Sequence, residues 1–283
     1  MGVPMGSEVP LEGGGSTPTA RDGELVLRES RPWTRSVHAV LEHLERQGLA
    51  CAPKVAGEGF AADGRETLYF IEGDVGPPSG GWSDDGIWEF GRLLADAHGA
   101  LLSFDPLPSV RWMPWWGRSL PGEPRIVGHC DAAPWNVIAR DGIPVALIDW
   151  DTTGPVGQLW DLAQAVWLNA QLHDDDVAER QGLPPAARRA ARARVMCDGY
   201  GLEATRRQAL IDLMIEMAVR TAAQEAIDAG VSLEGTQPQP FGLLGGGPPF
   251  SGHELLWAVT WRVRSARWML DNRQLLEKAL GTG

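Results

Sequence analysis

The stretch GHCDAAPWNVIARDGIPVALIDWD, residues 128–151, carries the most informative pattern in this chain. Two β-like runs, 135–140 and 143–149, are separated by Asp141-Gly142. An Asp-Gly pair between such runs is one of the strongest short signals for a β-hairpin with a two-residue turn. The sequence therefore predicts a tight hairpin with Asp149 at its open end.

The register of this hairpin decides which side chains share a face. A two-residue turn places Asn136 opposite Leu147, so that Asp149, two residues further on, lies on the same face as Asn136. Diagonal neighbours of this kind are about 7–8 Å apart at the backbone and closer at their side chains. We expect the amide oxygen of Asn136 and the carboxylate of Asp149 to bind one Mg²⁺ ion, which prefers oxygen ligands.

A second carboxylate precedes the hairpin. Asp131 lies five residues before Asn136, on the loop that enters the first strand. A carboxylate in this place can accept the proton of a substrate hydroxyl while a metal ion neutralises a transferred phosphate. The stretch thus supplies one base, one neutral oxygen ligand and one anionic ligand within nineteen positions, 131 to 149.

Composition excludes several classes of protein. The 283 residues include 25 Lys and Arg and 37 Asp and Glu, which gives a formal net charge of −12. This balance argues against sequence-independent nucleic-acid binding, which needs a basic surface. No apolar stretch approaches the roughly 18–20 residues that span a bilayer, and no signal-peptide pattern is present. Three scattered cysteines form neither a disulfide framework nor a zinc site, so we expect a cytoplasmic protein without nucleic-acid or membrane partners.

The first part of the chain is rich in β-type patterns. Residues 24–28 and 67–71 read as strands, and apolar residues with helical spacing follow Thr34. We expect residues 1–72 to form a small, mostly antiparallel β-lobe with one helix.

The remainder is mostly helical. A Gly- and Pro-rich segment, 73–81, marks the boundary, and Ser83 then caps a new helix. Later helices are predicted at 159–172, 185–200, 203–229 and 253–279. We expect residues 73–283 to form a larger helical lobe that contains the hairpin, with the helices after residue 180 and the loop 235–252 forming a substrate pocket.

The pattern His-x-Asp-x₄-Asn at 129–136, followed by Ile-Asp-Trp-Asp at 148–151, resembles the aminoglycoside phosphotransferase and choline kinase family. Gly154-Pro155 and the Trp-Asp-Leu-Ala run at 160–163 add to a likeness that covers roughly residues 11–172. The resemblance implies a two-lobed α+β fold of the protein-kinase type, with Mg²⁺ as cofactor and ATP or GTP as co-substrate.

The resemblance also implies roles for individual residues. Asp131 would be the catalytic base, and Asn136 and Asp149 would be the Mg²⁺ ligands. His129 would structure the loop, and Asp161 would be a structural carboxylate at a helix start. Two interpretations of Asp151 remain: a supporting role at the metal site, or an exposed residue at the end of a strand.

The sequence departs from the family where a lysine usually holds the α- and β-phosphates, because Arg28 stands there. Arginine can bind phosphate through two N–H groups, but its rigid fork differs from an ammonium group. For the glutamate that pairs with it, helix phase favours Glu45 over Glu42.

Other matches concern the nucleotide site. Residues 70–73 resemble the family's hinge, which suggests that the backbone of Ile71 and Gly73 holds adenine. The Gly-rich run 13–16 is a candidate phosphate cover, and Cys130 replaces the glycine usual between the His and Asp of the motif.

We therefore expect Mg²⁺-dependent transfer of the γ-phosphate of ATP or GTP to a hydroxyl of a small molecule. The acidic charge favours a cationic acceptor. The identity of the acceptor stays open among an aminoglycoside, another antibiotic, choline, homoserine and a sugar. The alternative is a weak or inactive pseudokinase that acts as a nucleotide- or ligand-binding module, which Arg28 and the short N-terminus motivate.

Overall fold

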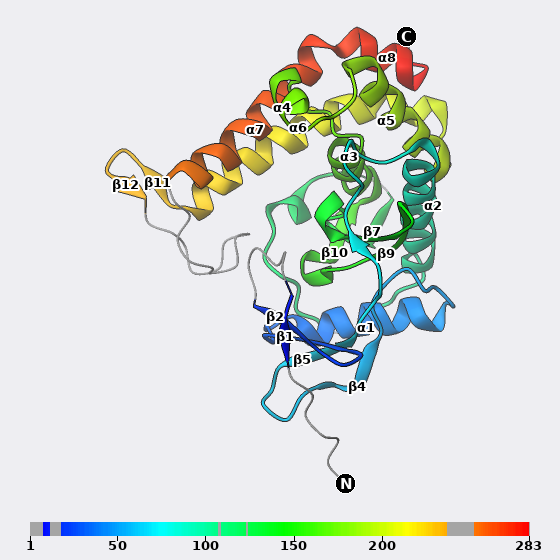
Figure 1. Cartoon of the computed structure of the whole chain (residues 1–283), viewed down its shortest axis with the longest axis vertical. Coiled ribbons are helices and arrows are strands. Elements are labelled where there is room, and N and C mark those ends of the chain that lie inside the picture. The colour runs from blue at the N-terminus through cyan, green and yellow to red at the C-terminus, as the bar shows by residue number, and fades with distance from the viewer. Residues whose placement is uncertain (1–7, 12–17, 107–108, 123, 237–251, 283) are drawn as a thin grey trace.

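The computed structural model describes residues 8–11, 18–106, 109–122, 124–236 and 252–282. It confirms the predicted two-lobed α+β architecture, with a small antiparallel sheet at one end and a larger helical lobe at the other (Figure 1). Among the described residues, no helix combines the length and apolar character that crossing a lipid bilayer requires.

The small lobe is built on one antiparallel sheet with the strand order β1-β2-β3-β5-β4. Its strands are β1 (Val9–Pro10), β2 (Thr19–Asp22), β3 (Leu25–Arg28), β4 (Val55–Phe60) and β5 (Glu66–Tyr69). Helix α1 (Thr34–Arg46) follows β3, and its predicted apolar face is buried at Val37, Val40, Leu41 and Leu44. The sheet sets Arg28 directly opposite Glu66 across the β3–β5 pair.

The large lobe is helical, as predicted. Its helices are α2 (Asp84–Leu101), α3 (Gln158–Asn169), α4 (Asp175–Arg180), α5 (Ala186–Tyr200), α6 (Ala204–Asp228), α7 (Gly252–Asp271) and α8 (Arg273–Leu280). The predicted helix 253–279 is thus two helices, interrupted at Asn272. Helices α6 and α7 run side by side to an arm that ends in the short strands β11 (Val231–Ser232) and β12 (Gly235–Thr236) (Figure 1).

The predicted hairpin lies between the lobes. Strands β8 (Val137–Arg140) and β9 (Ile143–Leu147) pair through the Asp141-Gly142 turn, and β6 (Asp74–Val75), from the chain linking the lobes, adds a third strand. A separate ladder joins β7 (Arg125–Gly128) to β10 (Gly154–Gly157). The loop that carries Asp131 therefore begins on one ladder and ends on the other.

The predicted register holds only next to the turn. Arg140 pairs with Ile143 and Ala139 with Pro144, but Ile138 then pairs with Ala146, which leaves Val145 as an extra residue. Proline has no N–H to donate to a ladder, and bulges are where strands accommodate it. The predicted pairing of Asn136 with Leu147 is therefore wrong, and the carbonyl of Asn136 instead accepts the N–H of Ile148 at 2.8 Å.

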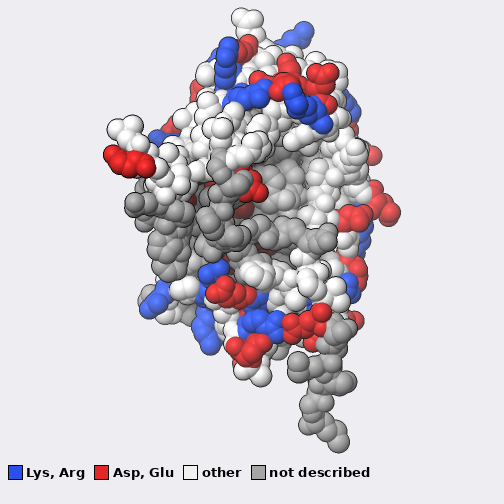
Figure 2. All heavy atoms as spheres, turned by 60° about the vertical axis from the view of Figure 1, so that its left-hand side comes forward, with Lys and Arg blue, Asp and Glu red and all other residues white. Residues whose placement is uncertain are grey.

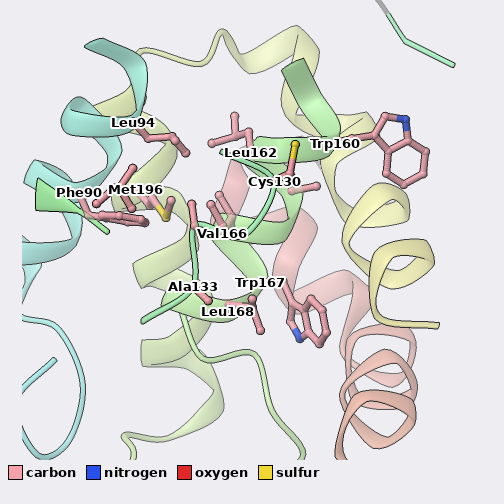
Figure 3. Close-up of a cluster of buried hydrophobic side chains, with 14 of the residues drawn as sticks. Phe90, Leu94, Cys130, Ala133, Trp160, Leu162, Val166, Trp167, Leu168 and Met196 are labelled. Carbon is pink, nitrogen blue, oxygen red and sulfur yellow. The ribbon is translucent and has the colours of Figure 1, made fainter. Parts of the chain in front are cut away.

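Helix α3 forms the centre of the large lobe. From Trp160 to Asn169 every residue of this helix is buried, as its mostly apolar sequence requires. Figure 3 shows α3 side chains such as Leu162 and Val166 lying between Phe90, Leu94 and Met196 of α2 and α5 and the loop residues Cys130 and Ala133. The loop that carries the predicted catalytic residues thus packs on the most buried helix of the structure.

Helices α2 and α5 approach each other closely at Gly91. A Cβ atom at Gly91 would lie 2.2 Å from the carbonyl oxygen of Met196, whereas one at Gly99 of the same helix would meet no atom within 4 Å. We expect Gly91→Ala to lower the free energy of unfolding by about 1–3 kcal/mol, the usual cost of overpacking a core.

Gly99→Ala is the matched control. It should raise the free energy of unfolding by about 0.5–1 kcal/mol, because alanine favours a helix over glycine. Urea unfolding followed by circular dichroism measures both values. Equal effects of the two substitutions would contradict the close approach of α2 and α5.

Candidate active site

The carboxylate of Asp161, at the start of α3, holds the loop in place. It is fully buried and accepts the backbone N–H groups of His129 at 2.9 Å and Cys130 at 2.8 Å. The Nε2 atom of His98 donates to the same carboxylate at 2.9 Å. Burial acts to raise the pKa of Asp161, but the hydrogen bond and charge of His98 outweigh it, so the pKa lies below its usual value. Asp161 therefore stays ionised and fixes the loop to the core.

His98 extends this contact to a third helix. Its Nδ1 atom lies 2.7 Å from the hydroxyl of Tyr200 on α5, so that α2, α3, α5 and the loop meet in one buried network. His98 belongs to no motif in the sequence, but its spacing from Leu94 and Leu101 places it on the buried face of α2.

Cys130 adopts a backbone conformation that favours glycine. Its φ is 63°, in the left-handed region, which explains why a glycine is usual at this position of the motif. The thiol is buried, which raises its pKa well above the usual value, and its sulfur lies 3.7 Å from the carbonyl oxygen of Gly154. The cysteine is thus a packed residue in a strained turn rather than a nucleophile.

Asp131 follows this turn and lies beside Asn136. The side-chain amide of Asn136 donates to both the backbone oxygen and the Oδ2 atom of Asp131, each at 2.9 Å. Burial, and then the charge of Asp149, raise the pKa of Asp131 to about 8. A carboxylate in this environment is well suited to take up a proton near neutral pH.

His129 links the loop to the end of the hairpin. Its Nε2–H donates to the carbonyl of Ile148 at 3.0 Å, and the centroid of its ring lies 4.5 Å from that of the Trp150 ring. Burial lowers the pKa of His129, so the neutral form is favoured. These contacts suit the predicted structural role.

Asp149 reaches the site through its own backbone conformation. With φ 58° and ψ 65°, it leaves the alternation of the strand that the sequence argument relied on. Its side chain is 45% exposed, and its Oδ1 atom accepts from Arg28 Nη1 at 3.0 Å. Asp151 accepts from Nη2 of the same guanidinium at 2.9 Å. Arg28 of the small lobe thus bridges two carboxylates of the large lobe.

The prediction that Glu45 pairs with Arg28 is wrong. Glu45 is exposed and pairs with Lys54 at 2.9 Å, whereas Arg28 pairs with the buried Glu66 opposite it in the sheet. The Nε2–H of His38, on α1, donates to the other oxygen of Glu66 at 2.8 Å. Helix phase alone could not identify Glu66, because directly opposed strand residues lie within about 5.5 Å of each other only once the register is known.

Asn136 and Asp149 carry the kinds of oxygen atom that a magnesium ion prefers. Asn136 offers an amide oxygen and Asp149 a carboxylate, and both are hard ligands. The close carboxylates act on one another, since Asp149 contributes to the raised pKa values of Asp131 and Asp151. A divalent cation would relieve this repulsion. In the described ranges no group of three or more His, Cys, Asp or Glu side chains forms a metal cage, and Mg²⁺ usually keeps waters and binds phosphate oxygens instead.

The predicted adenine site lies in the chain that links the lobes. Arg140 Nε donates to the carbonyl of Glu72 at 2.9 Å, and Gly73 lies so close to β8 that a Cβ atom would be 2.5 Å from the carbonyl oxygen of Ala139. Glu72 and Gly73 are thus positioned against the hairpin, and the role of Ile71 and Gly73 toward adenine stays a prediction. The candidate phosphate cover, 13–16, lies outside the described residues.

A cavity of about 160 Å³ opens beside Asp131. Besides Asp131, its walls come from the loop, the segment before β7, α3, α6 and α7, and include Trp115, Trp135, Gln164, Trp167, Thr221, Glu225, Trp261 and Arg262. A larger cavity of about 530 Å³ is on the outer side of the small lobe, away from Asp131. Sequence reasoning placed the pocket on the helices after residue 180 but did not identify Gln164, Glu225 or Arg262. Most of the loop 235–252 lies outside the described residues.

The comparisons with known proteins agree with this geometry. Residues 73–196 match the sequence profile of the family described as "Phosphotransferase enzyme family". The trifolitoxin immunity protein of Rhizobium leguminosarum bv. trifolii is 46% identical over 276 residues, which cover 98% of this chain and all of that protein.

Solved structures of small-molecule kinases share the fold. A choline/ethanolamine kinase family protein from Mesorhizobium loti has a TM-score of 0.58 and 16% identity, covering 98% of this chain and 92% of that one. Amicoumacin kinase hAmiN, in complex with AMP-PNP, Ca²⁺ and Ami, has a TM-score of 0.61 and 12% identity, covering 92% and 88%. ADP-bound aminoglycoside phosphotransferase APH(2'')-Ib has a TM-score of 0.54 and 11% identity, covering 94% and 95%. At these identities the likeness shows the fold alone.

Replacing Asp161 tests the anchoring of the loop. Asp161→Asn leaves one backbone N–H facing an amide N–H₂, and we expect it to lower the free energy of unfolding at pH 7 by about 1–3 kcal/mol. Because the folded pKa of Asp161 is lowered, its contribution is present above about pH 4 and is lost as the pH falls through the folded pKa.

The variant should therefore lose less stability than the wild type on acidification below about pH 4. Urea unfolding at a series of pH values measures this difference. Asp212→Asn, which removes an exposed carboxylate paired with Arg273 on the surface, is the control and should cost less than about 1 kcal/mol. If Asp161→Asn is as stable as the wild type at pH 7, Asp161 does not anchor the loop.

Replacing Glu66 tests how Arg28 is held. Glu66→Gln removes the buried charge next to the guanidinium, and we expect nucleotide binding to weaken by about tenfold, or about 1.4 kcal/mol. Titration with a fluorescent ATP analogue measures the dissociation constant. Glu45→Gln is the matched control and should bind as the wild type does. The reverse result would restore Glu45 as the partner of Arg28.

Proposed function

The chain belongs to the phosphotransferase enzyme family, and from this premise we propose that it transfers the γ-phosphate of ATP or GTP to a hydroxyl group of a small molecule. The observation that carries the proposal is the position of Asp131. This partly buried carboxyl group lies against the amide of Asn136, within the field of Asp149, at the wall of a cavity.

In this proposal Asp131 acts on the acceptor. Its carboxylate orients the acceptor hydroxyl in the cavity and takes its proton as the oxygen bonds to the γ-phosphorus. The bond from this phosphorus to the bridging oxygen breaks, and the nucleoside diphosphate leaves. Burial and the charge of Asp149 raise the pKa of Asp131, which makes its ionised carboxylate a stronger base toward the hydroxyl proton.

The remaining residues act on the nucleotide. Arg28 can exchange its carboxylate partners for phosphate oxygens, because a guanidinium presents several N–H groups in a plane. Asn136 and Asp149 would hold Mg²⁺, which supplies the positive charge that neutralises the phosphates. The backbone of Ile71 and Gly73 would hold the adenine ring.

The relatives support a toxic small molecule as acceptor. The 46% identical protein is named for immunity to trifolitoxin, and structural neighbours include an amicoumacin kinase and aminoglycoside phosphotransferases. We infer that phosphorylation of such a compound protects the cell. ATP is available in the cytoplasm, and we place the reaction there.

A pseudokinase is the second candidate. It is favoured by one observation, the engagement of Asp149 and Asp151 by Arg28, which occupies a predicted metal ligand. Nucleotide binding without transfer to any acceptor would support it.

The decisive test is a phosphorylation assay with Asp131→Asn. We incubate the protein with Mg-ATP and a panel of hydroxylated antibiotics and toxins, and detect the phosphorylated product by mass spectrometry. Loss of the base should lower turnover by about 10²–10⁴-fold and leave nucleotide affinity nearly unchanged. Removal of Mg²⁺ with EDTA should abolish transfer.

Asp105→Asn, an exposed carboxylate on the loop after α2, is the control and should retain wild-type turnover. Wild-type turnover in Asp131→Asn would exclude Asp131 as the base.

A further inference from the structure

The cavity beside Asp131 has walls of four indole rings. Trp115 and Trp135 lie on the loop side, and Trp167 and Trp261 lie on the helical side. Trp167 and Trp261 stack with ring centroids 5.5 Å apart, which makes a flat apolar wall between α3 and α7. A molecule that enters this cavity therefore places flat or apolar groups against indole faces.

The only carboxylate in the wall besides Asp131, among the described lining residues, is already neutralised. Glu225 is 3% exposed and forms an ion pair with Arg262 at 2.7 Å. The second amino group of Arg262 donates to the carbonyl of Ala258 at 2.7 Å, so the guanidinium is held in the wall. The cavity thus offers no free anionic partner for an ammonium group other than the catalytic Asp131.

Charged side chains of both signs are mixed on the surface. Figure 2 shows Asp and Glu interspersed with Lys and Arg on the upper and lower parts of one face, so these parts carry no single sign of charge.

Three polar atoms of the wall have no hydrogen-bond partner. These are Gln164 Oε1 and Glu225 Oε2, which accept hydrogen bonds, and Trp167 Nε1, which donates one. Gln164 is 7% exposed and Glu225 is 3% exposed. Buried polar atoms without a partner are costly, and because Gln164, Trp167 and Glu225 line the cavity, a bound molecule can supply the missing partners.

A secondary amide meets these needs. Its N–H can donate to Gln164 Oε1 or Glu225 Oε2, and its carbonyl oxygen can accept from Trp167 Nε1. An ammonium group could satisfy the two acceptors but not the indole N–H, and it would stand against Arg262.

From these observations we propose that the acceptor is an uncharged hydroxyl compound that carries a secondary amide next to a flat or apolar group. This deepens the proposed function, on which it rests for the role of Asp131. It replaces the cationic acceptor that the net charge of the chain favours, because the charge of the cavity wall differs from that of the whole protein.

A matched pair of ligands tests the proposal. Phenylalaninol and N-acetylphenylalaninol have the same hydroxyl and the same ring, but the first is a cation near neutral pH and the second is an uncharged amide. Isothermal titration of the full-length protein with Mg-AMP-PNP present gives both dissociation constants. We expect the acetylated compound to bind at least about tenfold more tightly.

Variants of Glu225 and Arg262 test whether the charges of the cavity wall cause the preference for the amide. Arg262→Gln frees the charge of Glu225 and should shift the ratio of the two dissociation constants by at least about tenfold toward phenylalaninol. The double variant Glu225→Gln with Arg262→Gln, which leaves no charge, should keep the preference for the amide. Glu216→Gln, which removes a charge elsewhere on α6, should leave the ratio unchanged.

Gln164→Leu provides a test that changes no charge and so covers the case in which Arg262→Gln fails to fold. It removes one acceptor atom and should weaken binding of the acetylated compound by about tenfold. Thermal unfolding of each variant establishes that it is folded.

Several results would overturn the proposal. They are a wild-type preference for phenylalaninol, binding of neither compound, and an unchanged ratio or affinity in both Arg262→Gln and Gln164→Leu. Because binding is measured without transfer, a preference for the amide with no phosphorylation of any acceptor would reject the kinase activity and keep the ligand class.

Discussion

The buried carboxylate of Asp161 is the constraint on which the site depends. An ionised group in the core is tolerated only when donors surround it, and here the donors are His98 and the backbone of His129 and Cys130. The loop must therefore pass close to the start of α3. Gly128 permits this approach, because a Cβ atom there would lie 2.4 Å from Asp161 Oδ2. The hydrogen bonds that the buried carboxylate of Asp161 requires thus fix the conformation of the loop. This conformation in turn determines the position of Asp131.

A second constraint crosses between the lobes. Arg28 contacts Glu66 within the small lobe and Asp149 and Asp151 in the large lobe, so one guanidinium forms ion pairs with three carboxylates. A lysine could not span these positions, because its single ammonium lacks the planar fork of donors. The arginine at this position therefore accounts for both the pairing within the sheet and the approach of the lobes. Its guanidinium also lies where phosphate would arrive, and could exchange Asp149 and Asp151 for phosphate oxygens.

The sequence predicted the local features whose causes are local. The Asp141-Gly142 turn, the cap at Ser83 and the apolar face of α1 all follow from neighbouring residues, and all are present. The bulge at Val145 was not predicted, although Pro144, which has no N–H to donate, indicates an irregular strand. Because of this bulge, Asn136 and Asp149 do not lie on the same face of the hairpin in the way that a regular two-residue turn predicts. Both residues still act on Asp131, because the amide of Asn136 donates to its carboxylate and the charge of Asp149 raises its pKa.

Pairings between distant elements could not be predicted in this way. Glu66 reaches Arg28 through strand register, and Glu225 on α6 meets Arg262 on α7 through helix packing, neither of which periodicity specifies. The same limit applies to electrostatics. A net charge of −12 describes mostly the outer surface, where ions screen it over about 10 Å. Inside the cavity the relevant quantity is the pairing of a few buried groups, and one arginine is enough to reverse the expectation that the whole chain suggests. The chemistry of the acceptor is therefore better argued from Gln164, Glu225 and Arg262 than from composition.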